Sequence, residues 1–327
     1  MPAEPTVSIV IPNLNGATPR DGLTYLDLVM GTLEGQSFRD FDVTVVDNGS
    51  TDESADYVRE RWPSVRLVEL SENLGFSAAI NRGVDASGGR YVALLNNDVE
   101  LSPDWLELLV AELERDPGVG FATGKVMRFG DRELIEQAGL DFYACGRFMP
   151  RGLDQPDRGQ YDERRPTAVV TATAAVYRRQ ALDAVGGFDE DYFLYCEDGD
   201  VCLRMLLAGY SGLYLPEPVA FHVSSGTLAA QTDLRRFYMI RNGLITMAKD
   251  VPASTLVRSL PQIAVYYGRQ LFISTVARAL GTAVRAYGSF LRALPATIRK
   301  RRAIQRARRM SPGAFAAQIS SGHPPPL

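Results

Sequence analysis

Residues 7–16 read VSIVIPNLNG, an apolar, β-branched run that ends in a turn rich in Asn and Gly. An uninterrupted apolar run predicts a strand that is buried on both faces. The chain then repeats the order of strand, loop and helix. The expected strands span 7–11, 41–46, 65–70 and 91–95, and the expected helices span 23–33, 54–61, 75–86 and 103–114. This alternation predicts an α/β fold with a single, mostly parallel central sheet flanked by helices.

The pattern loosens in the next part of the chain. Residues 127–166 are rich in Gly, Arg and Asp with scattered aromatic residues, which suggests an inserted loop or hairpin over the sheet edge. Beyond it, the expected strands span 167–177 and 212–215, and the expected helices span 198–208 and 234–248. We also expect Ser102 to cap the helix that begins at Pro103.

The overall charge hides a division along the chain. The 327 residues carry 35 basic and 39 acidic side chains, for a formal net charge of -4, but no acid follows Asp250. The last 77 residues hold 12 of the basic side chains. The composition excludes a wholly disordered chain, and no segment predicts a secretion signal or a membrane-spanning helix. Three cysteines without metal-ligand spacing suit a reducing cytoplasm.

The basic segment, residues 251–310, is expected to form an amphipathic helical extension. Its arginines recur every seven residues, with apolar residues among them, at Arg278, Arg285, Arg292, Arg299 and Arg306. Such a face is either a solvated surface packed on the body or an interfacial surface whose arginines reach the phosphates of anionic lipids. Nucleic acid ranks lower as a partner, because the segment has few polar side chains that read bases.

Composition gives three further expectations. Pro295 is expected to kink or break its helix. Residues 311–327 are rich in Gly, Ser and Pro and are expected to be disordered. Only three of the 35 basic residues are lysines, which we attribute to genome bias rather than to chemistry.

Polar side chains follow each of the first four expected strands. They are Asn13 and Asn15, then Asp47, then Asn73 and Gly75, and finally Asn96, Asn97 and Asp98. Ligands of open parallel sheets bind beyond the carboxyl ends of the strands, so these groups are expected to share one crevice. Each group alone is also an ordinary turn former, and only the coincidence of all four argues for a site.

The candidate chemistry rests on a few carboxylates. Neither G-x-G-x-x-G after the first strand nor G-x-x-x-x-G-K-[ST] occurs, which argues against a dinucleotide hydride carrier and a P-loop. Asp98 suits a divalent metal that neutralises a diphosphate. The cluster of Glu197, Asp198 and Asp200 predicts a general base or, alternatively, carboxylates that favour a helix start. His222, one of two histidines, is either structural or a ligand.

These motifs resemble family 2 of the glycosyltransferases, which has a GT-A fold, and in particular its bacterial rhamnosyltransferase-type members. The resemblance is carried by VSIVIPNLNG, VVDNGSTDES, ENLGFSAAINRGV, YVALLNNDVEL and GGFDEDYFLYCEDGDVCLRMLLAGY, followed by His222. It covers about residues 5–247 in collinear order. It implies one catalytic domain, 1–250, made of a Rossmann-like nucleotide-sugar-binding half (1–126) and an acceptor half (127–250).

The resemblance also implies which residues bind the donor. Asp47 would read the base or ribose of the nucleotide. The other implied donor-binding residues are Pro12, Asn13, Asn15, Asn73, Gly75, Asn81, Asn96 and Asn97. Arg235, Arg236 and Arg241 are expected, from their place on the last helix before the extension, to meet the pyrophosphate of the donor or of a lipid-linked acceptor.

For catalysis, the resemblance implies that Asp198 is the base and that Glu197 supports it. Asp98 would hold a divalent metal, Mg²⁺ or Mn²⁺, and His222 would complete its coordination. Asn96 stands where the family's DXD motif has its first Asp, which implies weaker metal binding assisted by the donor's diphosphate.

The implied activity is inverting transfer of a sugar, L-rhamnose from dTDP-rhamnose, to a hydroxyl of a lipid-linked or cell-surface glycan at the inner face of the cytoplasmic membrane. One alternative keeps this chemistry with a UDP-sugar donor, such as galactofuranose or an N-acetylhexosamine. The other alternative is a non-catalytic sugar-nucleotide-binding subunit that the basic extension recruits to a membrane or partner.

Overall fold

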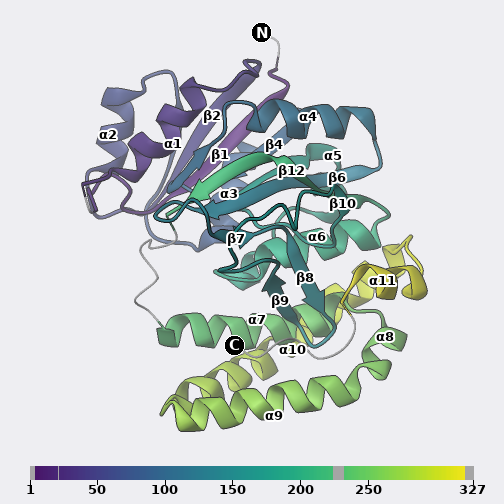
Figure 1. Ribbon diagram of the computed structural model, residues 1–327. Helices are drawn as coiled ribbons and strands as arrows, with labels where there is room; N and C mark the ends of the chain where they lie inside the picture. The colour runs from purple at the N-terminus through teal and green to yellow at the C-terminus, as the bar shows by residue number, and fades with distance from the viewer. Residues whose placement is uncertain (1–3, 21, 224–231, 321–327) are drawn as a thin grey trace.

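The computed structural model describes residues 4–20, 22–223 and 232–320. A twisted sheet lies at its centre, helices cover both faces of the sheet, and a layer of C-terminal helices packs below them in the view of Figure 1. The strands are β1 (Val7–Asn13), β2 (Phe41–Asn48), β3 (Arg66–Leu70), β4 (Tyr91–Leu95), β5 (Val99–Leu101), β6 (Val119–Arg128), β7 (Ile135–Gln137), β8 (Leu140–Tyr143), β9 (Arg147–Pro150), β10 (Arg165–Pro166), β11 (Ala174–Arg178) and β12 (Ser211–His222).

The helices follow the same numbering along the chain. They are α1 (Tyr25–Glu34), α2 (Ser54–Arg61), α3 (Phe76–Asp85), α4 (Trp105–Arg115), α5 (Arg179–Val185), the short 3₁₀ helix η1 (Glu190–Tyr192), α6 (Glu197–Leu207), α7 (Thr232–Asp250), α8 (Ala253–Arg258), α9 (Leu260–Val276), α10 (Leu280–Ala307) and α11 (Pro312–Gln318).

The sheet is mostly parallel, as the sequence predicts. Its strand order is β10-β12-β6-β11-β4-β1-β2-β3. Strand β1 pairs in parallel with both β2 and β4, and β12 pairs in parallel with β6. Two strands of this order are antiparallel to their neighbours: β11, between β4 and β6, and the edge strand β10, beside β12. The carboxyl ends of β1, β2 and β4 therefore lie together at one edge.

The side chains of β1 point alternately to the two faces of the sheet and are apolar on both, which explains why helices cover both faces. Ile9 and Ile11 belong to one core, with apolar residues of α1 and α4, whereas Val10 belongs to the other core, with residues of α3 and α6. All three side chains are at most 1% exposed. Because successive side chains of a strand point to opposite faces, an apolar run without alternation must be buried on both.

The predicted cap of α4 is wrong. The helix begins at Trp105, its N-cap position is Asp104, and no side chain caps it. The hydroxyl of Ser102 instead accepts a hydrogen bond from the backbone N–H of Val219 on β12 at 3.2 Å. The helix therefore starts later than the sequence suggests, and Ser102 lies too far ahead of it to reach the first turn.

The segment 127–166 forms the predicted hairpin. Strand β7 pairs with β6, and β8 and β9 form a separate two-stranded ribbon that extends toward α7 in Figure 1. At the tip of the ribbon, a Cβ on Gly146 would lie 2.1 Å from the carbonyl oxygen of Gly243 on α7. Only glycine permits this approach, so the ribbon and the C-terminal helices meet backbone to backbone.

The extension differs from expectation in two ways. Helix α10 continues through Pro295 without a break. Pro295 is exposed, so water can bond the carbonyl that its missing N–H leaves free. Part of the segment predicted to be disordered forms α11, where the hydroxyl of Ser311 caps the helix and Phe315 is fully buried. Residues 321–327 lie outside the described part of the chain.

Replacing Phe315 with alanine tests the burial of α11. Loss of a fully buried phenyl ring is expected to lower the free energy of unfolding by about 3–5 kcal/mol. Phe272→Ala is the matched control, because Phe272 is 69% exposed. Denaturant unfolding of both variants measures the difference. Equal stability of the two variants would contradict the packing of α11 against the body.

Candidate active site

Hydrogen bonds join the carboxyl ends of β4, β1 and β2. The side-chain amide of Asn97 donates to the side-chain oxygen of Asn13 at 2.8 Å, and the Asn13 amide donates to Asp47 at 3.2 Å. Asn13 and Asp47 are partners in the β1–β2 register. These bonds join three of the four predicted strand ends, and Asn48 at the end of β2 joins the fourth through its hydrogen bond to Asn73 after β3.

A second set of contacts fixes the loops after β1 and β2. Asn15 adopts a left-handed backbone with φ of 56°. Its backbone N–H donates to the hydroxyl of Ser50 at 2.9 Å, and its side-chain oxygen accepts from the N–H of Thr51 at 2.8 Å. Pro12 is half-buried beside them on β1. Asn tolerates this conformation better than most residues, because its side chain bonds the backbone locally.

The loop after β3 is tied to the turn ahead of α6. The side-chain amide of Asn48 donates to the Asn73 side chain at 3.0 Å, and the Asn73 oxygen accepts from the N–H of Gly75 at 2.9 Å. Gly75 has φ of 90°, and a Cβ there would lie 2.6 Å from the carbonyl oxygen of Phe193. The glycine is therefore required for close packing against the Phe193 turn.

Asn81 makes contacts of a different kind from those predicted for it. Its amide donates to the carbonyl of Phe188 at 2.9 Å and its oxygen accepts from the Phe188 N–H at 3.0 Å. This pair of bonds fastens α3 to the segment ahead of η1. A contact between Asn81 and a nucleotide remains a prediction.

Beyond β4 lies a row of three interacting side chains, in which His222 stands between Asp98 and Glu136. Strand β5 runs antiparallel to β12, and this pairing carries Asp98 to His222. The Nε2 atom of His222 lies 3.1 Å from Asp98 Oδ1, and its Nδ1 atom lies 2.8 Å from Glu136 Oε1. Burial lowers the pKa of His222, but the two carboxylates outweigh it and raise the pKa to about 10.

The donor set at this position fits a cation that is shared with a ligand. Among the described residues, no group of three or more His, Cys, Asp or Glu side chains is arranged to hold a metal ion. A cation that displaced the Nε2 proton of His222 could take one nitrogen from it and one oxygen from Asp98, while Glu136 orients the ring through Nδ1. With two protein ligands, such a cation would take its remaining ligands from water or from a bound ligand.

The predicted catalytic base, Asp198, and its neighbour Glu197 lie at the start of α6. Asp198 is partly buried, and its carboxylate accepts from the N–H groups of Gly199 and Ala172. Burial outweighs these bonds and raises the pKa of Asp198 to about 6. The carbonyl of Thr173, next to Ala172, accepts from the N–H of Asn96 at 3.0 Å. The segment ahead of β11 thus links Asp198 to the strand end that carries Asp98.

Glu197 has a different environment from Asp198. Its side chain is 5% exposed, and one carboxylate oxygen is buried without a hydrogen-bond partner. Burial, together with the nearby charge of Asp198, raises the pKa of Glu197 well above its ordinary value. Burial therefore raises the pKa of both carboxylates, and that of Asp198 reaches about 6.

Asp200 is not part of the reactive pair. It is fully buried, and Arg204 pairs with it at 2.7 Å across one turn of α6. Burial raises its pKa, but the charges of Arg204 and Lys249 prevail and hold the pKa of Asp200 well below its usual range. Asp200 therefore anchors α6 to α7 as a permanent anion.

The turn that precedes α6 is strained. Phe193, Tyr195 and Cys196 have φ of 57°, 66° and 73°, in the region that favours glycine. The side-chain amide of Asn242 on α7 donates to the carbonyls of Tyr192, Leu194 and Tyr195 at 3.0, 2.8 and 2.7 Å. Asn242 is fully buried. One amide thus holds the backbone that aims Glu197 and Asp198.

The three predicted arginines of α7 have separate surroundings. Arg241 donates to the carbonyl of Asp191 at 2.8 Å and to Ser289 on α10 at 3.1 Å, so it joins three elements. Arg236 lies 3.6 Å from Asp233. Arg235 is exposed and near Tyr195, whose pKa burial raises while the Arg235 charge opposes the rise. Of the three, Arg235 is the most exposed, and its contact with a pyrophosphate remains a prediction.

All three lysines lie between carboxylates, and the attribution of their rarity to genome bias stays a prediction. Each of the three bridges two carboxylates: Lys125 bridges Asp157 and Asp162, Lys249 bridges Asp189 and Asp200, and Lys300 bridges Asp189 and Asp191. A compact ammonium group with three donors fits between two carboxylates, where the planar fork of arginine does not. Two of these bridges connect α6 and α10 to the segment ahead of the strained turn.

Sequence reasoning missed Asn242, Glu136 and Lys249. Asn242 carried a usable signal, since it is a polar residue between Ile240 and Leu244 on the buried face of α7. Glu136 carried none, because only the pairing of β7 with β6 brings it to His222.

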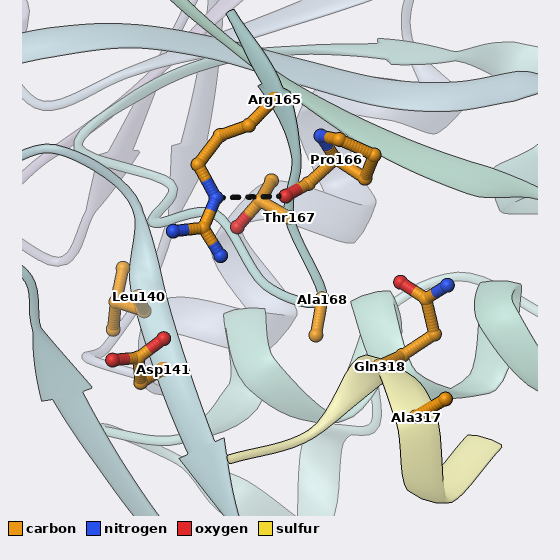
Figure 2. A pocket seen from close by; sticks show the side chains of 8 residues that line it. All are labelled: Leu140, Asp141, Arg165, Pro166, Thr167, Ala168, Ala317 and Gln318. Carbon is orange, nitrogen blue, oxygen red and sulfur yellow. Dashed lines mark hydrogen bonds between the residues drawn. The ribbon is translucent and has the colours of Figure 1, made fainter. Parts of the chain in front are cut away.

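A separate hollow lies between β8, β10 and α11. Figure 2 shows Arg165 and Asp141 facing it, with Gln318 across from them. Its volume is about 270 Å³, and none of the predicted site residues lines it. It is therefore not part of the candidate active site.

Comparison with known proteins agrees with this geometry. The profile of the family described as "Glycosyl transferase family 2" matches residues 8–186. An N-acetylglucosaminyl-diphospho-decaprenol L-rhamnosyltransferase of Mycobacterium tuberculosis is 30% identical over 221 residues, which are 61% of this chain and 71% of that protein. The amylovoran biosynthesis glycosyltransferase AmsB of Erwinia amylovora is 30% identical over 65% of this chain and 68% of that protein.

Two solved structures share the fold. The structure titled GalNAc-T7 with UDP, GalNAc and Mn²⁺ has a TM-score of 0.61 at 14% identity, covering 81% of this chain and 52% of that one. A mannosyltransferase from Pyrobaculum calidifontis, in complex with GDP-Man and Mn²⁺, has a TM-score of 0.54 at 19% identity, covering 97% and 86%. The fold and strand-end site define a GT-A enzyme. The chain belongs to glycosyl transferase family 2.

Asn242→Ala tests whether the amide positions the base. We expect kcat to fall by about 100-fold with donor KM nearly unchanged, because a misplaced base costs rate rather than binding. The control is Gln36→Ala, which also removes a buried amide that bonds backbone far from the site. Both changes are expected to cost about 1–3 kcal/mol of stability. An equal fall of kcat in both variants would refute the positioning role.

The pKa of Asp198 predicts the pH dependence of the reaction. A base must be ionised to act, so kcat/KM is expected to fall tenfold per pH unit below about pH 6 and to level off above it. Initial rates from about pH 5 to about pH 8 at saturating metal measure this profile. A rate that stays constant down to about pH 5 would contradict the assignment.

Proposed function

We propose that this chain transfers L-rhamnose from dTDP-rhamnose to a hydroxyl of a lipid-linked glycan, with inversion at the anomeric carbon. The observation that carries the chemistry is the placement of Asp198, whose pKa is raised to about 6, beside the strand ends. The choice of sugar and acceptor is supported by the relative from Mycobacterium tuberculosis, whose name specifies a rhamnosyl transfer to a diphospho-decaprenol carrier.

The donor nucleotide is proposed to lie across the carboxyl ends of β1, β2 and β4. Asp47 would accept hydrogen bonds from the base or ribose, and Asn13 and Asn97, already in contact with each other, would line the same pocket. Pro12, Asn15, Asn73, Gly75, Asn81 and Asn96 complete the proposed donor set. Asp98 and His222 would hold a divalent cation, which would supply positive charge to the diphosphate leaving group.

The acceptor hydroxyl is proposed to meet Asp198. Ionised Asp198 takes the proton of that hydroxyl as its oxygen forms the new bond to the anomeric carbon and the bond to the nucleotide diphosphate breaks. Burial and the charge of Asp198 raise the pKa of Glu197, which favours its protonated form beside the Asp198 anion. Arg235 lies open for an acceptor or donor phosphate.

Asp198→Asn separates binding from chemistry. The amide cannot take a proton, so we expect turnover to fall by about 10²–10⁴-fold while donor affinity stays within about twofold of the wild type. Release of free nucleotide diphosphate measures turnover for dTDP-rhamnose and for UDP-sugars, with and without Mg²⁺ or Mn²⁺. Retention of most activity would remove Asp198 from the role of base, and preference for a UDP-sugar would overturn the rhamnose assignment.

We further propose that the extension binds the surface of an anionic membrane from one side. No helix in the described part of the chain is long and apolar enough to cross a bilayer. Yet α9 and α10 expose large apolar side chains, with Phe272 69%, Val276 68% and Leu291 63% exposed. The arginine row lies beside them: Arg278, Arg285, Arg292, Arg299 and Arg306 are all exposed. Apolar and basic rows side by side suit the headgroup boundary.

The variant Arg292→Gln/Arg299→Gln tests this association without disturbing the core. Deleting the extension is less informative, because Lys300 and Phe315 tie it to the body. Each arginine near an anionic surface contributes about 1 kcal/mol, so we expect roughly thirtyfold weaker binding to phosphatidylglycerol vesicles. Co-sedimentation measures it, with phosphatidylcholine vesicles as the blank. Unchanged binding to the vesicles would indicate that the arginine row is a solvated helical face and does not bind membrane.

A further inference from the structure

A basic pocket lies where α8, the end of α10 and the start of α11 meet. Its volume is about 530 Å³. Four arginines line it, Arg301, Arg302, Arg306 and Arg308, together with Gln305 and Ser254. No carboxylate is among its lining residues. None of the predicted donor, metal or base residues contributes to it, so it is separate from the candidate active site.

Among the described residues, no ion pair neutralises the positive charge of this pocket, and the one carboxylate whose charge acts on it is that of Asp250, through Arg301. In the ranges 4–20, 22–223 and 232–320, none of the four arginines forms an ion pair, and the sequence has no acid after Asp250. The carboxylate of Asp250 is itself fully buried. Guanidinium groups gathered without a counter-ion repel one another, so the arrangement favours an anionic ligand.

Backbone contacts hold two of the guanidinium groups in place. Arg301 donates from one nitrogen to the carbonyls of Ala248 and Val251, both at 2.8 Å. Arg308 donates to the carbonyl of Met310 at 3.0 Å, and its Nε atom is buried without a hydrogen-bond partner. A buried N–H without an acceptor costs free energy that a ligand oxygen can recover.

Both exposed rows of α10, one of arginines and one of apolar residues, lead to the pocket. In the arginine row, Arg306 follows Arg299 by seven residues and lines the pocket. In the apolar row, Gln305 follows Ile298 by seven residues and lines it too. A ligand with a charged head and an apolar chain would therefore find a polar pocket at the end of an apolar track.

We propose that this pocket binds a phosphate group, which Arg302 and Arg306 contact from the exposed side while Arg301 and Arg308 contact it from the buried side. Arginine binds phosphate through paired, charge-assisted hydrogen bonds. The phosphate belongs either to the headgroup of an anionic phospholipid or to a soluble phosphate compound. Neither source requires the proposed glycosyl transfer, and only the lipid source rests on the proposed membrane association.

The experiment compares two variants of the full chain that lose the same charge from the same helix. Arg302→Gln/Arg306→Gln alters the pocket, and Arg292→Gln/Arg299→Gln alters the row outside it. All four side chains are exposed and make no hydrogen bond or ion pair among the described residues, so both variants are expected to fold, which thermal melting checks. The probes are inorganic phosphate, followed by calorimetry, and phosphatidylglycerol vesicles in phosphatidylcholine, followed by co-sedimentation.

The proposal requires the pocket variant to bind at least one probe about tenfold more weakly than the row variant does. A difference with vesicles alone identifies a lipid headgroup, and a difference with inorganic phosphate identifies a soluble phosphate. If the two variants bind both probes equally, only the number of charges matters and the pocket proposal is overturned. If both variants lose the same affinity for vesicles, the membrane proposal still holds. Neither binding measurement depends on sugar transfer.

Discussion

The buried amide of Asn242 is the contact on which the candidate catalytic geometry depends. Its bonds to the carbonyls of the turn hold Phe193, Tyr195 and Cys196 in a backbone region that costs about 1–3 kcal/mol per residue. The turn ends at Glu197, so the strained backbone directly precedes the two carboxylates that are proposed to act in catalysis. Because Asn242 lies on α7, the conformation of this turn depends on the packing of α7 against it.

The same docking makes the C-terminal helices part of the enzyme. Lys249 and Lys300 meet at Asp189, which joins α7 and α10 to the segment ahead of α6. Asp200 receives Lys249 from the other side and stays ionised deep in the protein. A buried ion pair contributes little net stability, but it fixes register, because leaving any one charge unpaired is costly. Lys249 of α7 thereby pairs with α6, the helix of the proposed base, and Lys300 of α10 pairs with the segment just ahead of it.

Periodicity and strand-end chemistry predicted much of this architecture from the sequence. The first four strands and helices, the mostly parallel sheet and the hairpin after residue 126 are all present. The predictions that were wrong share a cause. Ser102 has the chemistry of a cap but bonds β12, and residues 312–318 have the composition of a disordered tail but bury Phe315. In both cases a partner distant in sequence decided the outcome, and local propensity does not report such partners.

The sequence by itself determined which chemical groups the chain offers: amides and carboxylates after each strand, one histidine at the end of β12, and a basic extension free of acids. Those follow from residue type and local order alone. Only the tertiary structure decided how the carboxylates differ. Burial raises the pKa of Glu197 and Asp198, whereas at Asp200 burial is outweighed by positive charges, which hold the pKa well below its usual range, although all three lie within one turn of helix. The reason is that a pKa is set by burial and by neighbouring charges, and tertiary packing decides both the burial and the position of Lys249 beside Asp200.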